Sequence, residues 1–142
     1  MNSQISRRLK MLGMILFLLG LLTGFVMANF RNQRMGLSAH MEGILNGIFL
    51  VITGIIWDEL RVSKSLRIIT FTTLIYGTYI NWLTTLFAAY LGTSKITPIT
   101  GVGFHGTDVQ EQLVTGGFIS VGVTMLFSLI VIIYGLRKVQ IG

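Results

Sequence analysis

The chain has 142 residues, of which 52% are hydrophobic and only 11% are charged. Soluble proteins contain about 25% charged residues, and a chain of this size buries only about 60–70% of its unfolded surface. The composition therefore excludes a soluble globular domain, and its hydrophobicity excludes a disordered chain. The absence of cysteine excludes disulfides and thiolate metal sites. The net charge of +6 comes from basic residues beside apolar runs, a pattern typical of membrane topology rather than of nucleic-acid binding.

Four apolar segments are long enough to cross the hydrocarbon core of a membrane, which takes about 20 helical residues. The predicted spans are residues 11–30, 38–57, 68–91 and 113–136. Their apolar residues are continuous or follow a helical period, so we expect an all-α membrane protein with a four-helix bundle rather than a β-barrel. The first segment also resembles a secretory signal, but its apolar run is longer than a typical signal, and we expect a true span.

The distribution of lysine and arginine predicts the orientation of this bundle. Eight of these residues lie on one side of the spans: Arg7, Arg8, Lys10, Arg61, Lys64, Arg67, Arg137 and Lys138. Three lie on the other side: Arg31, Arg34 and Lys95. The positive-inside rule then places both termini in the cytoplasm of a cell inner-membrane protein, as one domain over residues 1–142. The outward loop 92–112 contains His105, which we expect to be solvated, and its length suggests a lid or a binding role.

Ionisable and amide side chains gather at the start of the second predicted span, where they are candidates for function. Glu42 and Asn46 are four residues apart and share one helix face, whereas His40 lies on a different face. A simpler interpretation is that His40 and Glu42 are interfacial anchors. Glu42 would then pair with Arg31 or Arg34.

The third predicted span carries a polar stripe formed by Thr70, Thr73, Gly77, Asn81 and Thr84 or Thr85. Counting from the outer ends of the two spans, near Ser38 and Tyr90, Asn46 and Asn81 both lie roughly 12–14 Å deep at about 1.5 Å per residue. The sequence therefore predicts a polar pocket in the outer half of the bundle. The alternative is an Asn–Asn clasp that only holds two helices together.

Two pairs of glycines stand four residues apart, a spacing that allows helices to approach closely. We expect Gly20 and Gly24 to serve helix packing. Gly43 and Gly47 flank the face of His40, so they could instead leave room for a flat cofactor. A histidine at a helix start with glycines on the following turns suits an axial haem ligand, which makes His40 the candidate metal ligand.

Two stretches of the chain resemble a known family of small four-span membrane isomerases, which comprises hydroxylaminobenzene mutase and styrene oxide isomerase. They are RMGLSAHMEGILNG at residues 34–47 and YGTYINW at residues 76–82. The styrene oxide branch differs at two positions: it has an aspartate where this chain has Gly77 and a tyrosine where this chain has Thr85. Glu42 and the Tyr-Gly-Thr-Tyr run favour the mutase branch.

The resemblance implies a haem b held by His40 between the subunits of a homotrimer, with the iron acting as a Lewis acid on a small aromatic substrate. The implied reaction converts hydroxylaminobenzene to 2-aminophenol in a dry, membrane-buried pocket. Asn46 and Asn81 are then expected to orient the departing oxygen, and Tyr79 is a candidate proton donor. Glu42 is expected to bond the second nitrogen of His40 or to shuttle protons.

Other functions remain alternatives at this point. The first is rearrangement of an epoxide to an aldehyde, as in the styrene oxide branch. The second is a non-catalytic haem-binding membrane subunit, and the third is a small transporter with Glu42 as its coupling carboxylate. The sequence has no P-loop or HExxH motif.

Overall fold

The computed structural model describes residues 2–137, in which the regular secondary structure is all helical and connected by loops. Lys138, one of the basic residues used above to predict orientation, lies outside the described residues. The long helices are α1 (Asn2–Val26), α2 (Gln33–Ile56), α3 (Lys64–Leu91) and α4 (Asp108–Arg137). Short 3-10 helices, η1 (Met27–Asn29) and η2 (Trp57–Glu59), follow α1 and α2.

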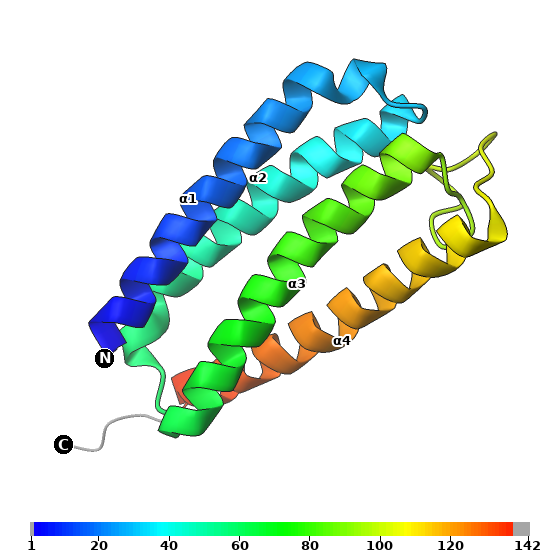
Figure 1. The fold of residues 1–142 in the computed structure, drawn as a ribbon. Coiled ribbons are helices and arrows are strands. Elements are labelled where there is room, and N and C mark those ends of the chain that lie inside the picture. The colour runs from blue at the N-terminus through cyan, green and yellow to red at the C-terminus, as the bar shows by residue number, and fades with distance from the viewer. Residues whose placement is uncertain (1, 138–142) are drawn as a thin grey trace.

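The four helices lie side by side in chain order (Figure 1). The main packing contacts join α1 to α2, α2 to α3 and α3 to α4. The start of α1, the α2–α3 connection and the end of α4 lie at one end of the bundle, and the other two connections lie at the opposite end (Figure 1). Helix α1 therefore covers α2, and helix α4 covers α3.

Three helical segments are long and apolar enough to cross a membrane: Gln4–Asn29, Gln33–Glu59 and Asp108–Arg137. Helix α3 is equally long at 28 residues, but its six threonines and Asn81 make it less apolar. Helices α1, α2 and α4 also begin several residues before the apolar runs that we used to predict the spans. A helix can continue through polar residues beyond its apolar run until a capping residue ends it. At the start of α2 this cap is Asn32, whose side chain accepts a hydrogen bond from the Met35 N–H at 3.1 Å.

Glycines bring α1 and α2 into backbone contact. A Cβ atom on Gly43 would lie 2.4 Å from the Gly20 Cα, and one on Gly47 would lie 2.6 Å from the Phe17 N. The expected packing role of Gly20 is therefore present in the structure. The space beside Gly43 and Gly47, which we expected to be available to a cofactor, is filled by the α1 backbone.

Two groups of buried apolar side chains hold the ends of the bundle. The larger one, at the end that carries the α2–α3 connection, consists of Leu9, Leu16, Leu50, Trp57, Leu60, Leu74 and Ile132. The smaller one, at the opposite end, consists of Met35, Ala88, Ala89 and Val114. The polar residues of α2 and α3 therefore lie between two apolar layers.

The loop between α3 and α4 is fastened by the carboxylate of Glu111, which is only 9% exposed. This carboxylate accepts hydrogen bonds from the backbone N–H groups of Ser94, Lys95 and Gly106 at 2.9–3.2 Å. One side chain in the first turn of α4 therefore holds both ends of the loop. Hydrogen bonds from backbone donors to an ionised acceptor are among the stronger ones in proteins.

We expect Glu111→Ala to lower the free energy of unfolding by about 2–3 kcal/mol, because several backbone donors lose their charged acceptor at once. A denaturant titration of the detergent-solubilised protein measures this change. Glu59→Ala removes an exposed carboxylate at the other end of the bundle and serves as the control. Equal stability of the two variants would contradict the role of Glu111.

Candidate active site

A carboxylate bridges the two asparagines that the sequence places at one depth. The Oε2 atom of Glu42 accepts hydrogen bonds from the Asn46 Nδ2 at 3.0 Å and from the Asn81 Nδ2 at 2.5 Å. Helices α2 and α3 thus bring these residues together, as their depths predicted. The connection is not the direct Asn–Asn clasp, because Glu42 stands between the amides. We call these three residues the Glu42 cluster.

The Glu42 cluster keeps hydrogen-bonding capacity for a ligand. The Glu42 Oε1 and the side-chain oxygens of Asn46 and Asn81 have no partner within residues 2–137. Asn46 is 9% exposed, whereas Glu42 and Asn81 are part-exposed. The cluster can therefore accept hydrogen bonds from N–H or O–H groups, and the second N–H of each amide is left to donate.

The outer arginines do not pair with Glu42. Arg31 donates to the Leu91 carbonyl at 2.8 Å, and Arg34 donates to the Val102 carbonyl. Both guanidinium groups therefore fasten the chain at the outer end of α3 and in the following loop. The interpretation of Glu42 as an anchor paired with one of these arginines is wrong.

His40 lies on the opposite side of α2 from Glu42, because two residues along a helix turn by about 200°. Its Nδ1 atom is 2.8 Å from the Gly20 carbonyl oxygen. A carbonyl only accepts, so Nδ1 is the donor of this hydrogen bond, and Nε2 has no partner within residues 2–137. Within one chain Glu42 therefore does not hydrogen-bond to His40, and a backbone carbonyl of α1 orients the imidazole instead.

The imidazole of His40 borders an apolar hollow of about 350 Å³ whose other walls are Leu21, Gly24, Phe25 and Met27. A Cβ atom on Gly24 would lie 2.8 Å from the Nδ1 of His40. Gly24, which we expected to serve helix packing, thus makes room for the ring of His40. The hollow supplies one wall for a ligand bound at Nε2.

Tyr79 does not join the Glu42 cluster. Its hydroxyl donates to the Leu12 carbonyl at 2.8 Å, and the neighbouring Trp82 donates to the Thr23 hydroxyl oxygen at 3.2 Å. Both aromatic side chains therefore point from α3 toward α1. The structure keeps Tyr79, the predicted proton donor, on a different face of α3 from Asn81.

Gly77 and Thr85 mark the two departures from the styrene oxide branch. A Cβ atom on Gly77 would lie 2.5 Å from the sulfur of Met125 in α4. The Thr85 hydroxyl donates to the Asn81 carbonyl at 2.8 Å. Met125 therefore occupies the space of any longer side chain at position 77, and nothing in the sequence of α4 points to this contact.

The outer loop contributes no residue to the Glu42 cluster or to the hollow beside His40. His105 is exposed there, and it does not line the hollow beside His40. Glu111, which sequence reasoning missed, serves the loop itself.

Comparison with known proteins places the chain in a family. The family model described as styrene oxide isomerase matches residues 5–137. The hydroxylaminobenzene mutase HabB of Ectopseudomonas oleovorans is 43% identical over 138 residues, which cover 96% of this chain and 84% of HabB. The hydroxylaminobenzene mutase HabA of the same organism is 38% identical over 127 residues, which cover 89% of this chain and 94% of HabA. No solved structure matches the chain. The chain therefore belongs to the styrene oxide isomerase family, and it is an isomerase.

Proposed function

We propose that this isomerase rearranges a small aromatic hydroxylamine, with hydroxylaminobenzene converted to 2-aminophenol. In this reaction the N–O bond breaks, a C–O bond forms at the ortho carbon, and the hydrogen displaced from that carbon ends on nitrogen. Substrate and product have the same atoms, so no oxidant or reductant is consumed. The names and identities of HabB and HabA support this substrate class.

The observation that carries the proposal is the set of unpaired acceptor oxygens in the Glu42 cluster. A hydroxylamine has N–H and O–H groups that can donate to these oxygens, whereas an epoxide has no such donor. The second N–H groups of Asn46 and Asn81 would donate to the oxygen as it leaves nitrogen. Hydrogen bonds that strengthen as charge develops on an oxygen lower the barrier of such a step.

We assign the haem-binding role to His40. Its Nε2 is unpaired beside an apolar hollow, and its Nδ1 is held by the Gly20 carbonyl, an arrangement common for histidine ligands of metals. These features fit a histidine that would hold a haem b. When bound, the haem iron supplies a Lewis acid that polarises the reacting oxygen. The Gly20 carbonyl would hold the orientation of the imidazole, and Gly24 would leave space for its ring.

The opposite placement of His40 and the Glu42 cluster supports a site built between subunits. One copy of α2 directs these groups about 160° apart, so they do not meet around one small substrate within a single chain. In a homotrimer, His40 of one subunit can face Glu42 of the partner subunit. We therefore propose a homotrimer with haem at the subunit interface.

We further propose that α3 is the fourth membrane span and that both termini face the cytoplasm at the inner membrane. Its flanking helices α2 and α4 are long and apolar enough to cross a membrane. The excess of basic residues at the end of the bundle that holds the α2–α3 connection supports the orientation. An apolar aromatic substrate would enter from the lipid, and the surrounding bilayer would keep water from the reaction.

The proposal is tested with purified protein in lipid nanodiscs, incubated separately with hydroxylaminobenzene and styrene oxide. We expect 2-aminophenol from the first substrate. Phenylacetaldehyde from the second without any 2-aminophenol from the first would contradict the proposal and support epoxide rearrangement. A proteoliposome assay in which the hydroxylamine drives proton flux without isomerisation would instead support the transporter alternative.

A further inference from the structure

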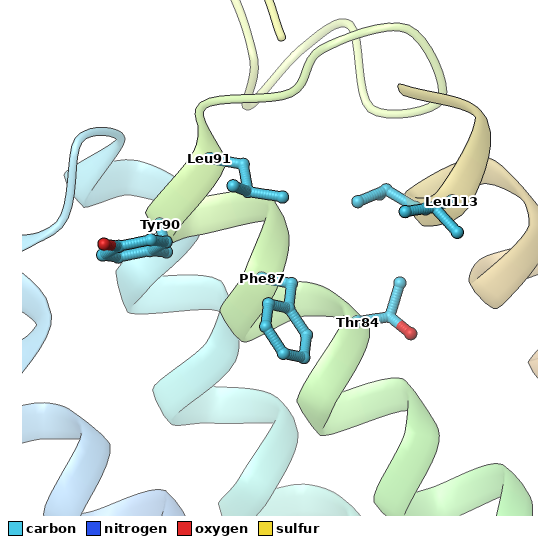
Figure 2. A pocket seen from close by; sticks show the side chains of 6 residues that line it. Thr84, Phe87, Tyr90, Leu91 and Leu113 are labelled. Carbon is cyan, nitrogen blue, oxygen red and sulfur yellow. The ribbon is translucent and has the colours of Figure 1, made fainter. Parts of the chain in front are cut away.

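The ends of α3 and α4 next to the outer loop border a half-open hollow of about 400 Å³ (Figure 2), and no residue of the Glu42 cluster lines it. Its lining residues are Thr84, Phe87, Tyr90 and Leu91 of α3 with Leu113 and Val114 of α4. The Tyr90 hydroxyl points away from α4, whereas Thr84 points toward it (Figure 2). The hollow therefore has apolar walls, with the Thr84 side chain at its α4 edge.

The Thr84 hydroxyl differs from those of other threonines in the helices. Eight of them donate to the carbonyl four residues earlier: Thr23, Thr53, Thr70, Thr72, Thr73, Thr78, Thr85 and Thr124. Thr84 makes no hydrogen bond within residues 2–137, although the residue is only 7% exposed. The hydroxyls of Thr93, Thr97 and Thr115 also lack partners but are fully enclosed, whereas that of Thr84 remains accessible.

Gly117 of α4 creates the room for this hydroxyl. A Cβ atom on Gly117 would lie 2.7 Å from the Thr84 Oγ1 and 2.8 Å from its Cγ2. A buried hydroxyl without a partner is costly unless a ligand or water satisfies it. An apolar hollow with one such group matches a ligand that has a flat apolar body and one polar atom.

We propose that this hollow binds a small aromatic molecule with a single hydroxyl or amino group, of the phenol or aniline class. The ring would lie between Phe87 and Leu113, and its polar group would hydrogen-bond to Thr84. A cavity of about 150 Å³ is enough for benzene, so this hollow also accommodates a substituted ring. The site goes beyond the proposed function, because no residue of the Glu42 cluster lines it and binding there needs no reaction.

The first test places a fluorescent reporter in the hollow. Phe87→Trp reports on the hollow, and Leu126→Trp is the matched control on the exposed face of α4, since Leu126 is 64% and Phe87 is 56% exposed. Both variants are titrated with 4-bromophenol, a quencher, in phosphatidylcholine nanodiscs, and the signal of the wild-type tryptophans is subtracted. We expect saturable quenching at position 87 and quenching proportional to concentration at position 126. Proportional quenching at both positions would show that the hollow holds only lipid and would overturn the proposal.

The second test concerns the hydrogen bond of Thr84 in the Phe87→Trp background. Thr84→Val removes the hydroxyl at nearly constant volume, and Thr84→Ser retains it. We expect the valine variant to bind 4-bromophenol about fivefold or more weakly than the serine variant, with bromobenzene bound equally by both. An equal loss for bromobenzene would overturn the role of Thr84. Neither probe needs turnover, so failure here leaves the proposed isomerisation intact.

Discussion

His40→Ala is expected to abolish the Soret absorption of the purified protein and to lower isomerase activity at least 1000-fold. The substitution removes the one nitrogen that the structure leaves unpaired beside the apolar hollow. Absorption spectra of protein purified with added haem measure binding directly, without reference to turnover. Activity is measured as 2-aminophenol formed per minute.

The chain provides a matched control for this experiment in its other histidine. His105→Ala should retain both the spectrum and the activity, because His105 is exposed in the outer loop. Added imidazole should restore part of the Soret band to His40→Ala but not to a misfolded protein. A colourless wild-type protein with full isomerase activity would refute the haem assignment.

Glu42→Ala is expected to lower kcat/KM for hydroxylaminobenzene at least 100-fold while haem remains bound. The substitution removes the acceptor of two amide hydrogen bonds, so Asn46 and Asn81 lose their fixed orientation. Loss of one fixed donor to an oxygen that develops charge in the reaction costs about 100-fold or more in rate, and here two amides lose their orientation. Steady-state kinetics in nanodiscs measure it, and the Soret band reports on the integrity of His40.

Glu59→Ala is the control for the removal of negative charge, since Glu59 is exposed and far along the chain from the cluster. Its kcat/KM should equal that of the wild type. An unchanged kcat/KM for Glu42→Ala would reduce the cluster to a structural link between α2 and α3. The effects of Asn46→Ala and Glu42→Ala should not add, because both residues belong to one hydrogen-bond network.

The sequence predicted the helices and the meeting of Asn46 with Asn81 because both depend on position along a helix. A rise of about 1.5 Å per residue fixes depth, and apolar runs fix which segments are helical. Depth and helical character are each determined within a single segment. Neither depends on how one helix is rotated about its axis relative to the next.

The partners of the site residues could not be predicted in this way. The contact of His40 with the Gly20 carbonyl depends on how α1 and α2 are rotated about their axes, and so does the contact of Met125 with Gly77. A glycine pair indicates close approach but not which helix fills the space, so Gly43 was assigned to a cofactor although α1 covers it. The unpaired hydroxyl of Thr84 likewise follows from a rotamer, which the sequence does not specify.

The contact between Gly77 and Met125 also constrains how a chain of this family can change substrate. The styrene oxide branch has an aspartate at position 77, and here its Cβ alone would lie 2.5 Å from the sulfur of Met125. A substitution to aspartate therefore requires the flexible end of the Met125 side chain to move aside. The two positions are coupled by packing between α3 and α4, so the effect of a change at position 77 depends on the residue at position 125.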